Sequence, residues 1–455
     1  MIGTEPTPLR VAIVGSGPAG FYTADALLKS EDPAVAVDVL DRLPTPWGLV
    51  RLGVAPDHEN IKAVSRAFEK TAARPGFRFF GNVEVGATVT HEQLLDLYDA
   101  VVYTVGAQTD RRLGIPGEDL PGSWPATAFV AWYNGHPDFQ ELEFDLDTER
   151  VVVIGNGNVA IDCARMLALT RDELAPTDTI DPAAEAIVAS PLREILMVGR
   201  RGPVQAAFTP PELKELGELA GAEPVVDRHD LDLDEASVAE LEADRERARR
   251  NFELLQEYAN RASDGKPRRI VLRFLSSPLA ILGEDRVEAI ELVRNELVEE
   301  GGRLVARPTG ETETIPCGLV LRSVGYKGVA LPGVPFDART GTMPNDRGRV
   351  EDAPRTYAAG WIKRGPSGVI GTNKKDATET VELLLEDARA GKLARGDSTQ
   401  TLEALLDAKG VSYVDYEGWQ AIDAVERAAG QPLSRPRVKL ATWEKLLDAG
   451  RRPAS

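Results

Sequence analysis

Two stretches of this chain, 140 residues apart, share one order of apolar and glycine positions. Val11–Val14 is a continuous apolar run typical of a buried strand, and it leads into Gly15-Ser-Gly-Pro-Ala-Gly20. Val151–Ile154 leads in the same way into Gly155-Asn-Gly-Asn-Val-Ala160. Alanine-rich, helix-favouring sequence follows both turns. A strand, a G-x-G-x-x-G/A turn and a helix in this order predict a dinucleotide site, so the pattern predicts two.

Each small residue of such a turn has a physical task. The first glycine allows the tight turn, the second lets the backbone approach a pyrophosphate, and the third allows the helix to pack closely on the sheet. The pyrophosphate then lies on unpaired N–H groups at the positive end of the helix dipole. A single turn of this kind also arises from chance glycines, but two in the same context favour two bound nucleotides.

The residues at the tips of the next strands differ between the two units. Asp41 ends the apolar run 35–40 and follows Gly20 by 21 residues, where an acid suits a ribose hydroxyl. In the second unit, Arg200 and Arg201 follow the run 194–198 and suit the 2′-phosphate of NADP. The alternatives are a solvated loop acid and a surface arginine pair. The sequence therefore predicts chemically different nucleotides for the two units.

The remaining pattern places the second unit inside the first. Further strands are predicted at 98–107, 269–275, 287–295, 319–324 and 357–361, a charged helical region at 227–264, and a helix from about residue 373. These elements predict an α/β fold of two Rossmann-like domains. Residues 1–108 and 325–455 would form the first dinucleotide-binding domain, and 109–324 an inserted NADP-binding domain. Residues 399–455 favour helices and show no recognisable chemistry.

Composition excludes several classes of protein. The 455 residues hold 53 Lys and Arg against 72 Asp and Glu, so the formal charge of −19 disfavours nucleic acid and anionic lipid as partners. No apolar run approaches the ~20 residues of a membrane helix, and Met1–Arg10 lacks an apolar core, so we expect a cytoplasmic protein. Cys163 and Cys317 are the only cysteines, which excludes a C-x-x-C redox pair and a cysteine-ligated cluster.

Three further features stay open on the residues alone. Thr45–Arg51 is either a wall for a flavin ring or an ordinary Pro-Gly loop packed by Trp47. His58 either handles a proton or is a solvated loop histidine. Glu212 and Glu215 begin a helix, where acids commonly serve the helix dipole alone.

Seven motifs match one known family in order and spacing between about Val11 and Thr380. They are VAIVGSGPAGFY, PTPWGLVR, GVAPDH, VVVIGNGNVAIDCAR, GRRGPVQAAFT, RSVGY and GWIKRGPSGVIGTNKKDA. On these motifs the chain resembles the ferredoxin-NADP reductases of the adrenodoxin-reductase type, especially their actinobacterial branch. The resemblance implies FAD in the first unit, NADPH in the inserted unit and a ferredoxin-type iron-sulfur protein as electron acceptor, since flavin can pass on a hydride's two electrons singly.

The resemblance also implies particular site residues. FAD would contact Gly15, Gly17, Ala19, Gly20, Asp41, Leu49, Val83, Trp361, Gly368, Val369 and Ile370. NADPH would contact Arg111, Gly155, Asn156, Gly157, Asn158, Val159, Arg200, Arg201, Glu212 and Gly368. His58 and Glu215 would form a proton-linked catalytic pair beside the flavin.

Two further expectations concern the surface that binds a ferredoxin and the alternative functions of the chain. Arg245, Arg247, Arg249 and Arg250 are the best candidate patch for an acidic ferredoxin, with a solvated helix face as an equal alternative. Thioredoxin-reductase-like proteins and glutamate-synthase small subunits share the glycine turns but need cysteines that this chain lacks. A flavin monooxygenase or oxidase is the main alternative function, and a nucleotide-sensing protein without enzyme activity is another.

Overall fold

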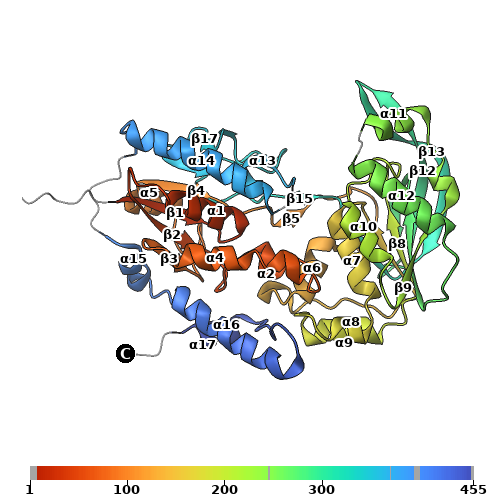
Figure 1. Ribbon diagram of the computed structural model, residues 1–455, viewed down its shortest axis with the longest axis horizontal. Helices are drawn as coiled ribbons and strands as arrows, with labels where there is room; N and C mark the ends of the chain where they lie inside the picture. The colour runs from red at the N-terminus through yellow and green to blue at the C-terminus, as the bar shows by residue number, and fades with distance from the viewer. Residues whose placement is uncertain (1–7, 244–245, 369, 394–399, 452–455) are drawn as a thin grey trace, which may run out of the picture. The chain divides into compact units, whose positions relative to one another are not determined.

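The computed structural model describes residues 8–243, 246–368, 370–393 and 400–451. By its contacts the chain divides into two compact units (Figure 1). Unit 1 comprises 1–109, 134–138 and 325–455, and unit 2 comprises 110–133 and 139–324. Each unit contains one strand, glycine turn and helix of the predicted kind.

Unit 1 is built on a seven-stranded sheet with the order β16-β17-β18-β4-β1-β2-β3. The strands are β1 (Leu9–Val14), β2 (Val35–Leu40), β3 (Phe77–Phe80), β4 (Ala100–Tyr103), β16 (Asn345–Asp346), β17 (Arg349–Val350) and β18 (Thr356–Ala358). The five from β18 to β3 run parallel, and β17 and β16 are antiparallel additions at one edge. The carboxyl ends of the parallel strands therefore share one edge of the sheet.

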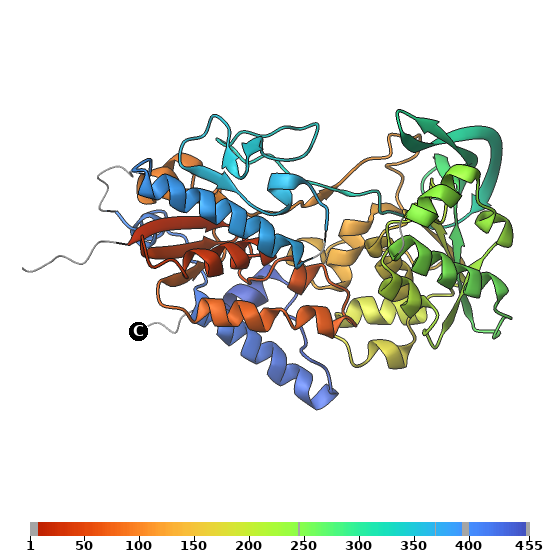
Figure 2. The same cartoon turned by 45° about the horizontal axis from the view of Figure 1, so that its top comes forward.

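Alternate residues of β1 face two separate apolar cores. Val11 and Ile13 pack with α1 (Pro18–Leu27), α4 (Ser65–Ala72) and α14 (Thr372–Arg389). Ala12 and Val14 pack with α5 (His91–Leu97) and α15 (Leu402–Ala408). Helices α1 and α14 run side by side along the sheet (Figures 1 and 2). A strand buried on both faces explains why its sequence is a continuous apolar run.

The other elements of unit 1 are short or lie near its end in sequence. They are α2 (Leu49–Leu52), α3 (Glu59–Lys62), α13 (Trp361–Arg364), α16 (Tyr416–Gly430), a 3-10 turn at Gln431–Leu433 and α17 (Trp443–Gly450). Short strands β5 (Thr109–Asp110) and β15 (Tyr326–Lys327) lie where the chain passes from one unit to the other.

Unit 2 holds a six-stranded sheet with the order β6-β14-β7-β8-β10-β9, in which all neighbours are parallel. The strands are β6 (Ser123–Pro125), β7 (Arg150–Ile154), β8 (Glu194–Val198), β9 (Ala222–Val226), β10 (Arg268–Arg273) and β14 (Leu319–Arg322). Its helices are α6 (Ala126–Tyr133), α7 (Asn158–Ala168), α8 (Arg171–Leu174), α9 (Asp181–Ala189), α10 (Pro210–Leu216), α11 (Glu235–Ala243) and α12 (Arg247–Asn260). No described helix of either unit is long and apolar enough to cross a membrane.

One part of unit 2 was not predicted. The strand expected at 287–295 is the longer β12 (Ala289–Glu300), which pairs antiparallel with β11 (Ser276–Leu282) and β13 (Arg303–Pro316). Residues 307–314 of β13 are exposed and are mostly Thr, Glu and Arg. This part of the strand therefore lacks the apolar alternation from which strands are predicted. Both cysteines are buried and free, and burial raises the pKa of Cys163.

A short segment, 134–138, belongs to unit 1 although unit 2 surrounds it in sequence. Asn134 is fully buried and accepts a hydrogen bond from Lys439 Nζ at 3.1 Å. Asp138 pairs with Arg42 at 2.7 Å. The pKa of His136, which lies between them, is lowered to about 4: burial lowers it most, Asp138 raises it, and Arg42 lowers it. His136 is therefore neutral in the folded protein over most of the acid range.

We predict that His136 makes unit 1 sensitive to acid. Its folded pKa of about 4 lies below the unfolded value of 6.5, so its contribution is complete above pH 6.5 and is lost as pH falls toward 4. Between pH 7 and 4.5, wild-type protein should lose about 1 to 3 kcal/mol more unfolding free energy than His136→Gln in urea titrations. His229→Gln, which removes an exposed histidine side chain, should retain the wild-type pH dependence. Equal losses in wild type and His136→Gln would contradict this role.

Candidate nucleotide sites

The first glycine turn leaves no room for side chains at two of its positions. A Cβ on Gly20 would lie 2.1 Å from the carbonyl oxygen of Gly15, and a Cβ on Gly15 would lie 2.8 Å from that of Thr104. Gly15 also has φ +104°, which glycine adopts without strain. A Cβ on Gly17, by contrast, would have its nearest contact at 3.9 Å, with the Cα of Gly48. The turn is tightly packed beneath and open at Gly17, as a phosphate-binding turn requires.

Asp41 binds the first turn directly. Its Oδ2 accepts hydrogen bonds from the Ser16 N–H at 2.8 Å and the Ser16 hydroxyl at 2.5 Å, and Oδ1 accepts one from Leu43 N–H at 2.9 Å. Burial raises the pKa of Asp41, and these hydrogen bonds lower it. The carboxylate therefore ties the tip of β2 to the turn after β1. Its predicted contact with a ribose hydroxyl would use the remaining lone pairs.

The predicted apolar contacts of the first unit lie on loops that meet at this edge of the sheet. Val83 is buried, and its N–H donates to the Asp41 carbonyl at 2.9 Å. Leu49 is 38% exposed, unusual for a leucine beside a tightly packed turn. Gly48 follows Trp47, whose N–H donates to the Ser16 carbonyl at 2.9 Å. The loop 45–51 therefore rests on the glycine turn and presents an apolar side chain to solvent.

Trp361 is positioned by the turn that precedes it. Gly360 has φ +78°, and a Cβ there would lie 2.6 Å from the Cβ of Ala19. The Gly360 N–H donates to the Asp376 carboxylate of α14, and the Trp361 ring packs at 5.3 Å from that of Tyr326. The Trp361 Nε1 is buried and has no hydrogen-bond partner among the residues that the structure describes. A buried, unpaired indole N–H fits a site that a polar ligand completes.

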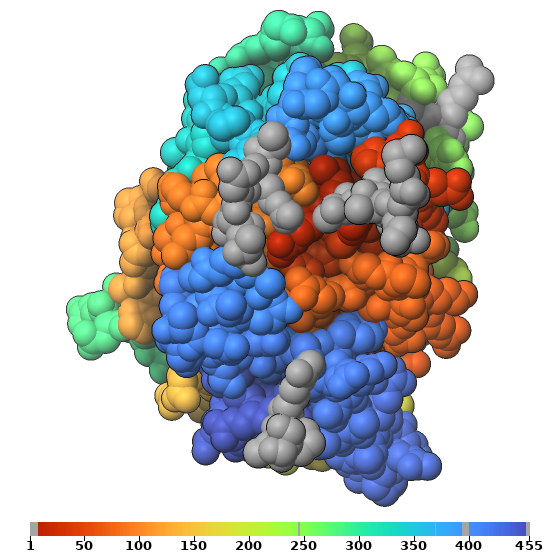
Figure 3. All heavy atoms as spheres, turned by 90° about the vertical axis from the view of Figure 1, so that its left-hand side faces the viewer, coloured from red at the N-terminus to blue at the C-terminus, as the bar shows by residue number. Residues whose placement is uncertain are grey.

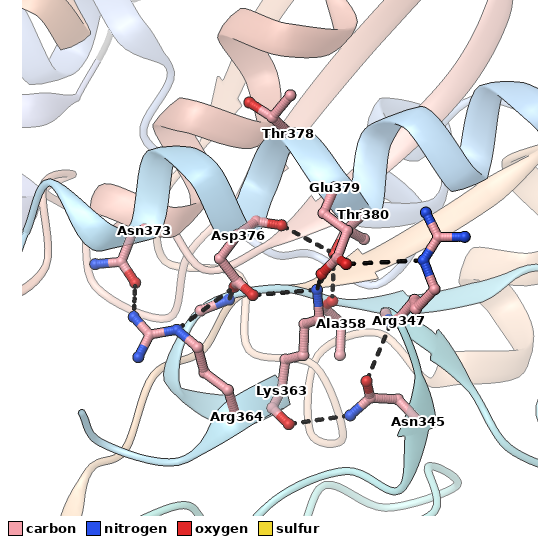
Figure 4. A network of polar contacts seen from close by, with 12 residues as sticks. Asn345, Arg347, Ala358, Lys363, Arg364, Asn373, Asp376, Thr378, Glu379 and Thr380 are labelled. Carbon is pink, nitrogen blue, oxygen red and sulfur yellow. Dashed lines mark hydrogen bonds and ion pairs between the residues drawn. The ribbon is translucent and has the colours of Figure 1, made fainter. Parts of the chain in front are cut away.

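A buried lysine of α13, Lys363, is bound by two carboxylates of α14 (Figure 4). Lys363 Nζ lies 3.1 Å from Asp376 Oδ1 and 2.8 Å from Glu379 Oε2, and its side chain is 7% exposed. Arg364 donates to Asn373 Oδ1 at 2.9 Å. Charge-assisted hydrogen bonds of this kind are short and strong, so α14 holds the backbone at Trp361 through its carboxylates.

The glycine turn that follows α13 is described in part. Gly368 is exposed with φ +78°, and Ile370 packs at the edge of the first apolar core. Val369 lies outside the described residues. Helix α14 begins at Thr372, after Gly371, close to the start expected at about residue 373.

The second glycine turn repeats the pattern in unit 2. A Cβ on Gly155 would lie 2.1 Å from the Ser323 carbonyl oxygen, whereas Gly157 has open space around its Cα. Asn156 accepts hydrogen bonds at its carbonyl from Ala207 and Phe208 N–H groups, and its side-chain Oδ1 is buried without a described partner. Val159 follows in the first turn of α7. As in unit 1, the turn is crowded below and open at its second glycine.

The loop after β8 folds back onto this turn. Asn158 Oδ1 accepts from Thr209 N–H at 2.8 Å, which joins the start of α7 to the start of α10. Arg200 and Arg201 lie at the tip of β8 with exposed side chains. Partial burial, and then the positive charge of Arg200, lowers the pKa of Arg201; Glu240 raises it, and Arg247 lowers it again. Cations that disfavour one another's charge create a local demand for an anion.

The acids of α10 surround a buried arginine that was not predicted as a site residue. Arg165 of α7 is 2% exposed, pairs with Asp162 at 2.6 Å and has its Nε 3.6 Å from Glu215 Oε2. Burial lowers the pKa of Arg165, whereas the charges of Glu215 and Glu212 raise it. Arg165 stands within a motif quoted above, but only the fold shows which carboxylates it meets.

The two remaining predicted residues, Arg111 and His58, belong to different units. Arg111 is exposed at the start of unit 2. His58 is buried in unit 1, where it precedes the first turn of α3. Because His58 and Glu215 belong to different units, their pairing stays a prediction.

Comparisons with known proteins agree with this geometry. A family model described as pyridine nucleotide-disulphide oxidoreductase matches residues 9–187. NADPH-ferredoxin reductase FprA of Mycobacterium tuberculosis is 51% identical over 97% of this chain and 99% of its own length. The chain belongs to the family of NADPH-ferredoxin reductases. Human mitochondrial NADPH:adrenodoxin oxidoreductase, 43% identical over 97% of this chain and 92% of its own, is a more distant relative.

A solved structure from this family has the same fold over its full length. Mycobacterium tuberculosis FprA in complex with NADPH has a TM-score of 0.93 and 52% identity, covering 98% of this chain and 100% of that one. The predicted fold class, two Rossmann-like domains with one inserted in the other, is confirmed.

Proposed function

We propose that this chain is an NADPH-dependent ferredoxin reductase with FAD as its resident cofactor. The observation that supports it most is the pair of glycine turns, each open at its second glycine, with a carboxylate at the first strand tip and two arginines at the second. A protein with this arrangement would hold an unphosphorylated ribose in unit 1 and a phosphorylated one in unit 2. A cytoplasmic location stays a prediction.

FAD fits the groups on the carboxyl edge of the unit 1 sheet. The open backbone at Gly17 would take the pyrophosphate, and Asp41 the ribose. Leu49, Val83 and Trp361 would line the remainder, with Gly368 and Ile370 beside the first turn of α14. The chemistry that FAD supplies when bound is the conversion of a hydride's two electrons into single-electron steps. The contribution of unit 1 is a rigid, largely apolar setting for it.

NADPH fits the second turn. The open backbone at Gly157 and the start of α7 would take the pyrophosphate, and Arg200 and Arg201 the 2′-phosphate. Arg247, close enough to lower the pKa of Arg201, would add a third cation there. Glu212 and Arg111 would contribute further polar contacts.

Proton handling would fall to His58 and Glu215. An imidazole changes charge near neutral pH, and a carboxylate beside it stabilises its protonated form. Arg165 would hold the Glu215 side chain in place, since its Nε lies 3.6 Å from Glu215 Oε2. Glu215 could then stabilise a proton on His58 during electron transfer.

Ferredoxin-dependent electron transfer tests the proposed function. The full-length protein, reduced with NADPH in the absence of oxygen, should reduce cytochrome c rapidly only when a ferredoxin is added. Rapid NADPH oxidation in air with stoichiometric hydroxylation of a substrate, unaffected by ferredoxin, would instead indicate a flavin monooxygenase. A yellow protein that NADPH never bleaches would indicate a nucleotide sensor.

Loss of both strand-tip arginines should abolish the preference for NADPH. Each charged hydrogen bond contributes about 1.5 to 3 kcal/mol, so Arg200→Ala with Arg201→Ala should lower the ratio of kcat/KM for NADPH over NADH by about 10² to 10⁴. Arg193→Ala is the matched control, because Arg193 precedes β8 at its opposite end and its side chain is 75% exposed. An unchanged ratio in the double variant would exclude a role for these arginines in recognising the phosphate.

The ferredoxin-docking patch is proposed on α12. Arg249 and Arg250 are exposed there, and Arg250 is 3.0 Å from Glu253. Arg245 lies outside the described residues, and Arg247 is assigned above to the nucleotide. At low salt, Arg249→Glu with Arg250→Glu should lower kcat/KM for ferredoxin about tenfold, and salt should narrow the difference. Arg303→Glu with Arg307→Glu on β13 gives the same net charge and should have little effect on kcat/KM for ferredoxin. A wild-type kcat/KM for ferredoxin at low salt in the variant with Arg249→Glu and Arg250→Glu would exclude the patch.

A further inference from the structure

The C-terminal segment, residues 411–450, contacts two loops at the carboxyl edge of the unit 1 sheet. It contains α16, α17 and the 3-10 turn between them. The loops follow strands β2 and β3, which are neighbours in the sheet, and each carries a residue proposed above to contact FAD. Figure 3 shows the dark blue and blue surface of this end of the chain packed against the orange surface of the N-terminal part of unit 1.

The first contact is a buried carboxylate that holds the loop 45–51. Glu426 of α16 is fully buried and accepts two hydrogen bonds from Arg51, at 2.6 and 2.8 Å. It also accepts from Leu440 N–H at 2.8 Å and Arg437 at 3.2 Å. Burial raises the pKa of Glu426, but the charges of Arg51 and Arg437 hold it below its usual value. A buried carboxylate with this many donors fixes the end of the loop in one position.

Tryptophan rings extend this contact to the middle of the same loop. Trp47 meets Trp419 of α16 edge-on at 4.8 Å. The Arg51 guanidinium lies over Trp419 at 5.2 Å, and that of Arg437 lies over Trp47 at 5.9 Å. Both arginines are therefore placed by a carboxylate and a ring together.

The loop needs such support because its backbone is strained. Trp47 has φ +86°, a region that side chains other than glycine rarely occupy. Gly48 follows with φ +49°, and a Cβ there would lie 2.9 Å from the Cα of Gly17. Strained backbone persists where surrounding contacts over-determine it. The packing of α16 on Trp47 supplies those contacts and presses the loop onto the first glycine turn.

The second and third contacts reach the tips of β2 and β3. Trp443 Nε1 donates to Asp138 Oδ1 at 2.7 Å, and Asp138 Oδ2 pairs with Arg42, the residue after Asp41. Gly81 and Val414 exchange backbone hydrogen bonds at 2.7 and 2.9 Å, two residues before Val83. The segment is therefore bonded beside Asp41, Leu49 and Val83 in turn.

We propose that the C-terminal segment is a positioning element for FAD, because the Glu426–Arg51 pair, the Trp47–Trp419 contact and the Trp443–Asp138–Arg42 chain fix the loops that carry Asp41, Leu49 and Val83. This inference rests on the proposed function, since it concerns the cofactor of unit 1. None of the segment's residues needs to touch FAD. Its effect is on how long the cofactor stays bound and how rigid the loop 45–51 is.

The test compares two buried carboxylates in the full-length, FAD-loaded protein. Glu426→Gln keeps the size of the side chain and removes the charge that holds Arg51. Asp387→Asn is the matched control: Asp387 of α14 is likewise buried and bound by both prongs of an arginine, Arg349, but has no described bond to the loop 45–51. FAD release on dilution, followed by the fluorescence of free FAD, should be about tenfold faster in Glu426→Gln and unchanged in Asp387→Asn.

Hydrogen exchange gives a readout that a general loss of stability would not reproduce. In Glu426→Gln the amides of residues 47–52 should exchange faster, while those of β1 and β4 should not. Trp443→Phe removes a single hydrogen bond and should give a smaller change in FAD release, about two- to threefold, if Glu426→Gln proves unstable.

Two outcomes would overturn the inference. One is wild-type FAD release in both Glu426→Gln and Trp443→Phe. The other is equal acceleration in Glu426→Gln and Asp387→Asn, which would mean that any loss of stability in unit 1 loosens the cofactor. Wild-type protein that binds no FAD, or that never passes electrons to ferredoxin, would instead overturn the proposed function itself.

Discussion

The closeness of helix to strand at the first glycine turn governs how unit 1 is arranged. With 2.1 Å between a hypothetical Gly20 Cβ and the Gly15 carbonyl oxygen, even one methyl group would push α1 away from β1. That distance also brings Ala19 against Gly360, and so sets the place of Trp361. In unit 2 the corresponding third position is Ala160, fully buried, so α7 leaves room for a methyl group. The two turns share a pattern but differ in how tightly they are packed.

A second constraint comes from charge inside the two units. Unit 1 has buried or half-buried carboxylates that each bind a backbone turn or an arginine: Asp41 binds Ser16, Asp376 binds Gly360 and Glu426 binds Arg51. A buried charge is costly unless donors surround it, and these acids are tolerated because backbone N–H groups and basic side chains supply those donors. These bonds hold the loops of unit 1 in definite positions. Fixed loops suit a protein that must hold a cofactor through repeated reduction and oxidation.

Sequence patterns predicted what is local in the chain and missed what is not. Asp41, Arg200 and Arg201 could be placed at the strand tips because their spacing from a glycine turn is a property of one βαβ unit. The bond from Asp41 to Ser16 was not foreseen, since either a ligand or the protein itself can satisfy an acid at that position. Glu426 and Arg51 are 375 positions apart, and nothing in the pattern of α16 distinguishes a buried glutamate from an exposed one. The strand β13 was missed because residues 307–314 are exposed and mostly polar on both faces. The role of Arg165 was missed because an arginine inside a helix gives no sign of its partners.

The order of strands in unit 1 has a consequence for the history of the chain. β4 and β18 are neighbours and run parallel, with about 250 residues between them, from Thr104 to Arg355. Parallel neighbours always require a crossover connection, for which a dozen residues and a helix suffice. All of unit 2 is therefore an enlarged crossover, and no ladder hydrogen bond of the unit 1 sheet depends on it. A simpler ancestor with one nucleotide could have acquired the second by lengthening a single connection, without rebuilding the sheet that held the first.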